Sequence, residues 1–169
     1  MSRLFFALWP DDAARAGMVS VMDRLPGDCG RFVAHRNLHI TLVFLGSVTK
    51  EQEQCVLTGA RNINVTPVTL TLDALGWWQR PQVIWLAPQK VPDALVILAD
   101  QLKAVAVQCG IKTDERPFST HATLVRKARK RVVLPEIAPI NWQVRDFCLV
   151  RSDTRAEGAS YQVIWSSTK

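Results

Sequence analysis

A four-residue pattern occurs twice in this chain, each time in a segment where apolar and polar residues alternate. The copies run from His39 to Leu42 and from His121 to Leu124, and both read His-x-Thr-Leu, 82 positions apart in a chain of 169 residues. Side chains at positions i and i+2 of a strand point to the same face of a sheet. Each copy therefore predicts a strand that presents an imidazole and a hydroxyl on one face and buries its apolar residues on the other.

Strand and helix patterns follow one another along the chain, and no low-complexity tract or long flexible linker divides it. Runs of period two or rich in β-branched residues predict strands over residues 3–9, 38–45, 68–75, 82–86, 121–125, 144–151 and 160–166. Apolar residues at helical spacing predict helices over residues 13–25, 49–63 and 94–108. We therefore expect a single domain that spans residues 1–169.

This order of elements predicts an α+β fold. Many strands with three helices among them favour antiparallel sheets that carry the helices on their outer faces. The two His-x-Thr strands fall in different halves of the chain, each near a helix and flanking strands. We therefore expect two pseudo-symmetric lobes that face each other across a central cleft.

The composition is that of a globular protein without a membrane-spanning segment. Hydrophobic residues make up 48% and charged residues 21% of the chain, and no apolar run approaches the roughly 18–20 residues that cross a bilayer. The apolar start, residues 4–9, is short and is followed at once by Pro10 and two aspartates, unlike a signal peptide. We expect a cytoplasmic protein with no membrane partner.

The four cysteines are predicted to be unpaired. Cys29, Cys55, Cys109 and Cys148 are widely scattered, form no Cys-x-x-Cys pair and have no histidine at ligand spacing. In a chain without an export signal, such cysteines are typical of buried or idle thiols. We therefore expect neither a disulfide nor a cysteine-bound metal.

The net charge of +6 suits an anionic partner such as RNA or a nucleotide phosphate. The basic run over residues 126–131 can track an RNA backbone, or it can be a solvated loop. Charge alone does not decide between a nucleic-acid partner and an ordinary basic surface.

Two imidazoles and two hydroxyls that converge on one cleft suit the chemistry of a phosphodiester. Attack on phosphorus needs a base that deprotonates the nucleophile and an acid that protonates the leaving oxygen, and histidine can be either at neutral pH. Threonine hydroxyls can donate hydrogen bonds to phosphate oxygens. An isolated His-x-Thr is more commonly a surface or core pair, but its repetition in both halves favours the functional interpretation.

The sequence around both motifs is similar to a known family. Residues 37–46, NLHITLVFLG, and residues 116–126, RPFSTHATLVR, resemble the paired signatures of the two-histidine (2H) phosphoesterases. Within that superfamily they resemble the bacterial RNA 2′,3′-cyclic phosphodiesterases, also called 2′-5′ RNA ligases, and the similarity extends over nearly the whole chain. Two departures are visible: Ala122 replaces a larger aliphatic residue, and Ser119-Thr120 stands where the family often has His-Pro.

The resemblance implies a bilobal fold and hydrolysis of an RNA terminal 2′,3′-cyclic phosphate to a 2′-phosphate, without metal or cofactor. It implies that His39 donates a proton to the departing O3′ and that His121 accepts one from water, while Thr41 and Thr123 bind the phosphate. In reverse, a 5′-hydroxyl RNA end could replace water and form a 2′-5′ linkage. The implied partners are RNA ends of this kind, tRNA fragments among them, bound by a monomer.

Other residues near the motifs are candidates for substrate contacts. Arg126 follows the second motif, and its guanidinium group suits phosphate oxygens. Among the aromatic residues, the candidates for stacking on a base are Phe5, Phe44, Trp77, Trp78 and Phe118, although most aromatic side chains are expected in the core.

Two other functions are compatible with these features. One is an RNA- or nucleotide-binding module without turnover, and the other is a 2H phosphodiesterase that acts on another cyclic phosphate, such as a cyclic nucleotide or an ADP-ribose derivative. A metal hydrolase is disfavoured because neither motif contains Asp or Glu.

Overall fold

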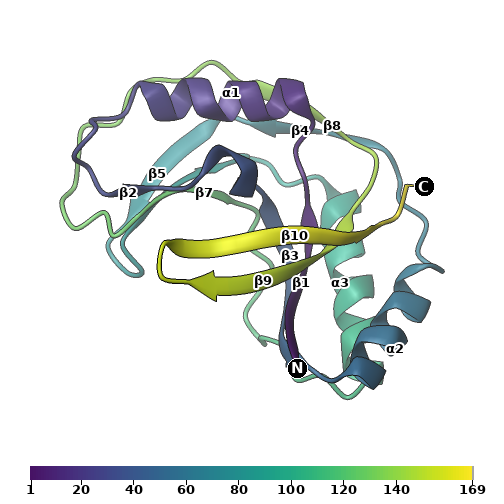
Figure 1. Ribbon diagram of the computed structural model, residues 1–169. Helices are drawn as coiled ribbons and strands as arrows, with labels where there is room; N and C mark the ends of the chain where they lie inside the picture. Colours follow the sequence, from purple (N-terminus) through teal and green to yellow (C-terminus); the bar gives the residue numbers. More distant parts are fainter. Residues whose placement is uncertain (169) are drawn as a thin grey trace.

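Three antiparallel sheets and three α-helices make up residues 1–168, the part of the chain that the computed structural model describes (Figure 1). The strands are β1 (Ser2–Leu8), β2 (Arg31–Phe32), β3 (Ile40–Val48), β4 (Val68–Leu72), β5 (Ala74–Trp78), β6 (Val83–Ala87), β7 (Ala122–Arg126), β8 (Ile140–Val144), β9 (Cys148–Arg155) and β10 (Gly158–Ser166). The helices are α1 (Asp12–Asp23), α2 (Lys50–Ala60) and α3 (Asp93–Gln108), and a 3-10 turn, η1, covers His35–Asn37. The expected α+β class is confirmed.

The first lobe is built on a sheet with the strand order β10-β9-β1-β3. Residues 4–8 of the inner strand β1 are all buried, because both faces of the sheet are covered there. Leu4, Phe6 and Leu8 join the main core, whereas Phe5 and Ala7 point to the opposite face. Helices α2 and α3 lie together on the outer side of this lobe, with α3 against β3 (Figure 1).

The second lobe contains a sheet of order β2-β7-β6-β5 and the two-stranded ribbon β4-β8. Helix α1 packs on β8 and lies along the edge of the molecule opposite α2 (Figure 1). Gly17 permits this packing, since a Cβ built there would lie 3.1 Å from a side-chain carbon of Ile140.

The lobes do not correspond to successive halves of the chain. Helix α1 directly follows β1 in sequence but packs in the second lobe, while β9 and β10 return from the second lobe to the first sheet. The chain therefore crosses between the lobes more than once, and the hairpin formed by β9 and β10 extends across the front of the molecule (Figure 1).

Two segments expected as single strands are each divided between sheets. The run over residues 68–75 becomes β4, which pairs with β8, and β5, which pairs with β6. The run over residues 144–151 likewise contains the end of β8 and the start of β9. The junctions hold charged residues, Asp73 in the first segment and Arg145 and Asp146 in the second, and a polar residue within a strand pattern does not show that the pairing partner changes. Strand β2 is only two residues long, too short to give a periodic pattern.

The expectation that all four cysteines are unpaired is wrong for one pair. Cys55 on α2 and Cys109 at the end of α3 form a disulfide with their Cα atoms 5.7 Å apart, whereas Cys29 and Cys148 are buried free thiols. The two helices approach closely at Gly59, where an added Cβ would meet a methyl group of Val105 at 2.5 Å. The pairing follows from this helix packing, which the spacing of cysteines in the sequence does not reveal.

Reduction of the Cys55–Cys109 bond is expected to lower the free energy of unfolding by about 2–4 kcal/mol, because the bond closes a long loop in the unfolded chain. Urea denaturation with and without reductant measures the difference. The double variant Cys55→Ser/Cys109→Ser is the control and should unfold at one midpoint under both conditions. Equal midpoints for the parent protein under both conditions would contradict the prediction.

None of the α-helices within residues 1–168 has the length and apolar character needed to cross a membrane.

Candidate active site

The two His-x-Thr motifs meet at one cavity of about 420 Å³ between the lobes. His39 directly precedes β3 of the first lobe, and His121 directly precedes β7 of the second. Both histidines line the cavity together with Thr41 and Thr123. The residue after each histidine, Ile40 or Ala122, is fully buried, so the expected alternation of faces is present in both strands.

Both imidazoles are held by the same hydrogen bond. Nδ1 of His39 lies 2.6 Å from the main-chain oxygen of Asn37, and Nδ1 of His121 lies 3.1 Å from that of Ser119. A carbonyl oxygen can only accept, so Nδ1 carries the proton in each ring. The neutral form of each histidine therefore has its lone pair on Nε2. This carbonyl two residues before each histidine was not among the residues expected from the sequence.

His39 sits among three aromatic rings. Its ring centroid lies 5.0 Å from Phe5, 5.6 Å from the stacked ring of Trp9 and 5.1 Å from the edge-on ring of Tyr161. Burial of the imidazole is the main cause that lowers the pKa of His39 to about 4; the hydrogen bond to Asn37 partly offsets it, and the nearby charges of Arg126 and His121 act in the same direction as burial. Nε2 lies 3.1 Å from Oγ1 of Thr41, whose hydroxyl can donate to it when the ring is neutral.

His121 has a more open environment. Its ring meets Trp78 edge-on at 4.8 Å, and Ser119 lies beside Nδ1. Burial lowers the pKa of His121 below its usual value, the hydrogen bond to Ser119 partly offsets this, and the charge of Arg126 lowers it further. The two imidazoles therefore occupy unequal environments in spite of their matching hydrogen bonds.

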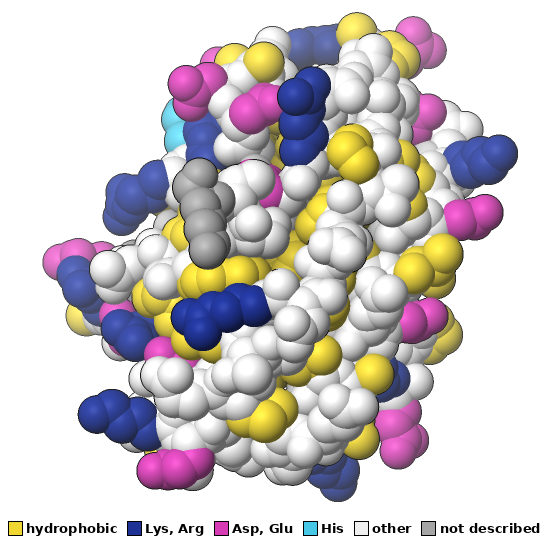
Figure 2. Space-filling model, turned by 90° about the vertical axis from the view of Figure 1, so that its right-hand side faces the viewer, with side chains coloured by type: hydrophobic (Ala, Val, Ile, Leu, Met, Phe, Trp, Pro, Cys, Tyr) yellow, Lys and Arg dark blue, Asp and Glu magenta, His cyan; other side chains and the backbone are white. Residues whose placement is uncertain are grey.

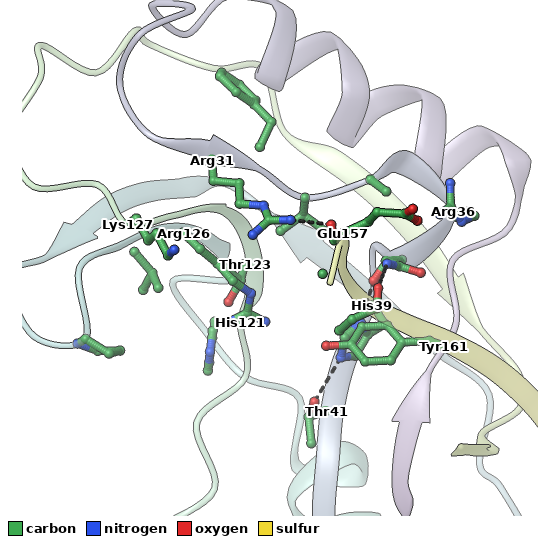
Figure 3. Close-up of a pocket in the computed structure, with 18 of the residues that line it drawn as sticks. Arg31, Arg36, His39, Thr41, His121, Thr123, Arg126, Lys127, Glu157 and Tyr161 are labelled. Atoms are coloured by element: carbon green, nitrogen blue, oxygen red, sulfur yellow. Dashed lines mark hydrogen bonds between the residues drawn. The ribbon is translucent and has the colours of Figure 1, made fainter. Parts of the chain in front are cut away.

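Positive side chains surround the cavity. Arg31, Arg126 and Lys127 gather on the side of His121 and Thr123, and Arg36 lies on the side of His39 (Figure 3). Glu157 is the one acidic residue among the described residues that line this cavity. The guanidinium group of Arg31 donates to the main-chain oxygen of Glu157, which connects β2 to the turn of the β9–β10 hairpin. The cavity is thus suited to an anion.

The structure brings most of the expected site residues to this region. Thr41, Thr123 and Arg126 line the cavity with the two histidines. Phe5 does not, because its ring is 3% exposed and lies against His39, so it has no face free for a base. The expectation that Phe5 contacts substrate is therefore not supported by its position.

Phe44 and Phe118 line a second cavity, of about 610 Å³, that shares Thr41, Trp78, Pro81 and His121 with the first. Tyr161 and Arg31 line the first cavity and were not expected from the sequence, whereas Trp78 was among the aromatic candidates for base stacking. Tyr161 and Arg31 belong to strands without a motif, and only the tertiary fold brings them to the cavity. The adjacent pair Trp77-Trp78 gave a weak signal for Trp78, since neighbouring strand residues point to opposite faces.

The metal-ligating side chains within residues 1–168 form no group of three or more that could hold a metal ion.

Comparisons with known proteins show which family this chain is similar to. A family model described as the 2′-5′ RNA ligase superfamily matches residues 9–156. The chain is 38% identical over 153 residues to the RNA 2′,3′-cyclic phosphodiesterase of Escherichia coli K12, covering 89% of this chain and 86% of that protein. It is 29% identical over 174 residues to the protein of the same name from Archaeoglobus fulgidus, covering 95% of this chain and 96% of that one.

Solved structures show the same architecture. A crystal structure of a phosphoesterase superposes with a TM-score of 0.92 at 34% identity, over 99% of both chains. Apo E. coli LigT superposes with a TM-score of 0.90 at 34% identity, over 98% of this chain and 95% of that one. The PDE domain of MHV ns2 shares the fold alone, at 11% identity and a TM-score of 0.66. On the family match and the E. coli relative, this chain belongs to the 2′-5′ RNA ligase superfamily.

Proposed function

We propose that this protein hydrolyses the 2′,3′-cyclic phosphate at the 3′ end of RNA to a 2′-phosphate, with His39 as proton donor and His121 as proton acceptor. The observation that carries this proposal is the matched pair of imidazoles. Each is fixed through Nδ1 to a carbonyl, and both line one basic cavity. Relatives in the family are named RNA 2′,3′-cyclic phosphodiesterases, which supports the substrate class.

The proposed reaction is a single in-line displacement. Nε2 of His121 takes a proton from water as the water oxygen attacks phosphorus, and the bond from phosphorus to O3′ breaks. Nε2 of His39, protonated once the substrate anion is bound, gives its proton to O3′. One proton is taken and one is given, so the products are a 2′-phosphate and a free 3′-hydroxyl. Two imidazoles supply both transfers, and the step needs no metal.

Thr41, Thr123 and Arg126 are proposed to bind the phosphate. The threonines line the cavity beside the two histidines, and Arg126 lies at the end of β7, where its charge already affects the pKa values of both imidazoles. Hydroxyl and guanidinium groups that point at the non-bridging oxygens stabilise the charge that develops on them.

The substrate is proposed to be an RNA end, tRNA fragments among them. The RNA nucleotides that precede the cyclic phosphate would lie along Arg31, Arg36 and Lys127, which line the first cavity. Elsewhere the surface is mixed: the face in Figure 2 carries Lys, Arg, Asp and Glu side chains interspersed around a centre that is largely uncharged. The protein is proposed to act as a monomer, and the cytoplasm, where RNA is cut and processed, is the proposed location.

Product analysis tests the proposal. An oligoribonucleotide that ends in a 2′,3′-cyclic phosphate is expected to yield the 2′-phosphate at the same rate with and without a chelator. A 3′-phosphate product would contradict the assignment of O3′ as leaving group. Salt-sensitive RNA binding without turnover would instead favour a binding module, and turnover of cyclic nucleotides alone would favour another cyclic phosphate as substrate.

A further inference from the structure

A third cavity, of about 940 Å³, adjoins the other two. It is lined by residues 75–80, which belong to β5 and the turn after it, and by residues 131–134. Strand β5 is the edge strand of its sheet. Trp78 lines all three cavities, and Arg80 lines both the second and the third. An extended ligand that is bound at the candidate active site can therefore reach the third cavity.

The third cavity combines positive charge with aromatic and aliphatic surface. Within the described part of the chain, its charged side chains are Arg80 and Arg131, and both are exposed. Trp77 and Trp78 line it from β5, and Val133, which is 93% exposed, lines it from the other segment. Single-stranded nucleic acids bind to surfaces of this kind, where cations contact the phosphates and apolar side chains contact the bases.

The basic segment over residues 127–131 is anchored by Ala128, its one buried residue. The amide of Ala128 donates to the main-chain oxygen of Gln82 at 2.9 Å, and its carbonyl oxygen accepts from Nε1 of Trp77 at 2.8 Å. Both main-chain groups of Ala128 are thus bonded to the region of β5 and β6. The segment therefore has a fixed position beside the cavities rather than that of a free surface loop.

The two ends of this segment lie at different cavities. Lys127 lines the first cavity (Figure 3), and Arg131 lines the third. Arg129 and Lys130 are also exposed, but they line none of the three cavities. Of the two interpretations of this basic run, contact with RNA therefore suits its two ends, and solvation suits the residues between them.

We propose that the third cavity binds nucleotides of the substrate RNA beyond those that lie at Lys127, with Arg131 and Arg80 on their phosphates. The cyclic phosphate is at the 3′ end, so the strand can extend only on the 5′ side of the terminal nucleotide. Each further nucleotide adds one negative charge, which suits two arginines with no carboxylate beside them. The inference rests on the proposed function, since it takes an RNA end as substrate, and it adds a preference for long substrates over short ones.

Substrates of increasing length test the inference. Cyclic 2′,3′-phosphates from a single nucleotide to about ten nucleotides are compared by kcat/KM, which in the parent protein should rise with length and then level off. Arg131→Gln should lower kcat/KM on the longest substrate by about fivefold, the counterion release of one phosphate contact at about 0.1 M salt. It should not change the value for the single nucleotide, and Arg131→Lys should restore the preference for length. Arg131 is the residue to change because Arg80 also lines the second cavity.

The salt dependence gives a second readout. In the parent protein, log kcat/KM should fall more steeply with log salt concentration for the longest substrate than for the single nucleotide. Arg131→Gln should reduce that slope by about 0.7, and only for the long substrate. The matched control is Arg129→Gln, which removes an exposed cation of the same segment that lines none of the three cavities. It should match the parent protein at every length.

Three outcomes would overturn the inference. One is an Arg131→Gln variant that equals the parent protein at every length, which would leave this groove to a protein partner. Another is an equal loss on the single nucleotide and on the longest substrate. The third is a parent protein whose kcat/KM does not change with length, a result that needs no variant. Absence of 2′-phosphate products at every length would instead contradict the proposed function itself.

Discussion

Replacing either His39 or His121 with alanine is expected to lower kcat for cyclic phosphate hydrolysis by about a thousandfold or more, since each loses one of the two proton transfers. The loss should fall on kcat more than on KM, because Thr41, Thr123 and Arg126 remain to bind the phosphate. The double variant should be little slower than either single variant, as the two groups act in one step. Single-turnover rates on the cyclic-phosphate oligonucleotide measure all three.

The matched control is His35→Ala. His35 is the one histidine of the chain outside the two motifs. It lies in η1, is exposed and lines neither cavity. This variant should keep the parent rate. Retention of full activity after loss of either His39 or His121 would contradict the proposed mechanism, whereas a loss in His35→Ala would show that the assay reports folding rather than chemistry.

The part of the site that strand alternation determines could be predicted from the sequence. A period of two placed His39 with Thr41 and His121 with Thr123, and the buried neighbours Ile40 and Ala122 have the opposite orientation in the structure. The pairing of the two motifs across a cleft followed from their presence in two strands of different halves. The alternation is a local property of each strand, whereas the meeting of the two motifs at one cavity is a property of the whole fold.

The remaining features of the site depend on contacts between segments that are distant in sequence. Tyr161 reaches His39 because β10 pairs with β9, which pairs with β1, and Trp78 reaches His121 through β5 and β6. Phe5 was expected at the substrate, but it lies on the face of β1 that packs on His39. A phenylalanine can pack in the core or stack on a nucleic-acid base. The residue type alone does not show which of the two it does.

The pH dependence of catalysis is expected to differ between the free and the substrate-bound enzyme. The pKa of His39 is about 4 and that of His121 also lies below its usual value, chiefly because both imidazoles are buried. The pH profile of kcat/KM reports the free enzyme, and it requires one imidazole protonated and the other neutral. Its maximum should therefore lie on the acidic side of about 6.5, the ordinary pKa of histidine.

Above both pKa values, kcat/KM should fall by about tenfold for each pH unit, because the proton that must be given to O3′ is lost. Binding of the phosphate places a negative charge beside both rings, which favours their protonated forms and raises both pKa values. The profile of kcat should therefore be a bell displaced to higher pH than that of kcat/KM. Initial rates over a range of substrate concentrations, measured between pH 4 and pH 9, give both profiles.

Arg126→Gln provides a second test of the same electrostatics. The cation of Arg126 disfavours protonation of both imidazoles, so its removal should raise both pKa values and move the maximum of kcat/KM to higher pH. KM should also rise, since a phosphate contact is lost. Arg129→Gln, which removes an exposed cation that lines neither cavity, should leave the profile in place. A value of kcat/KM that stays level or increases between pH 6.5 and pH 8 in the parent protein would contradict the lowered pKa values, because imidazoles buried in this way give up their protons before neutral pH is reached.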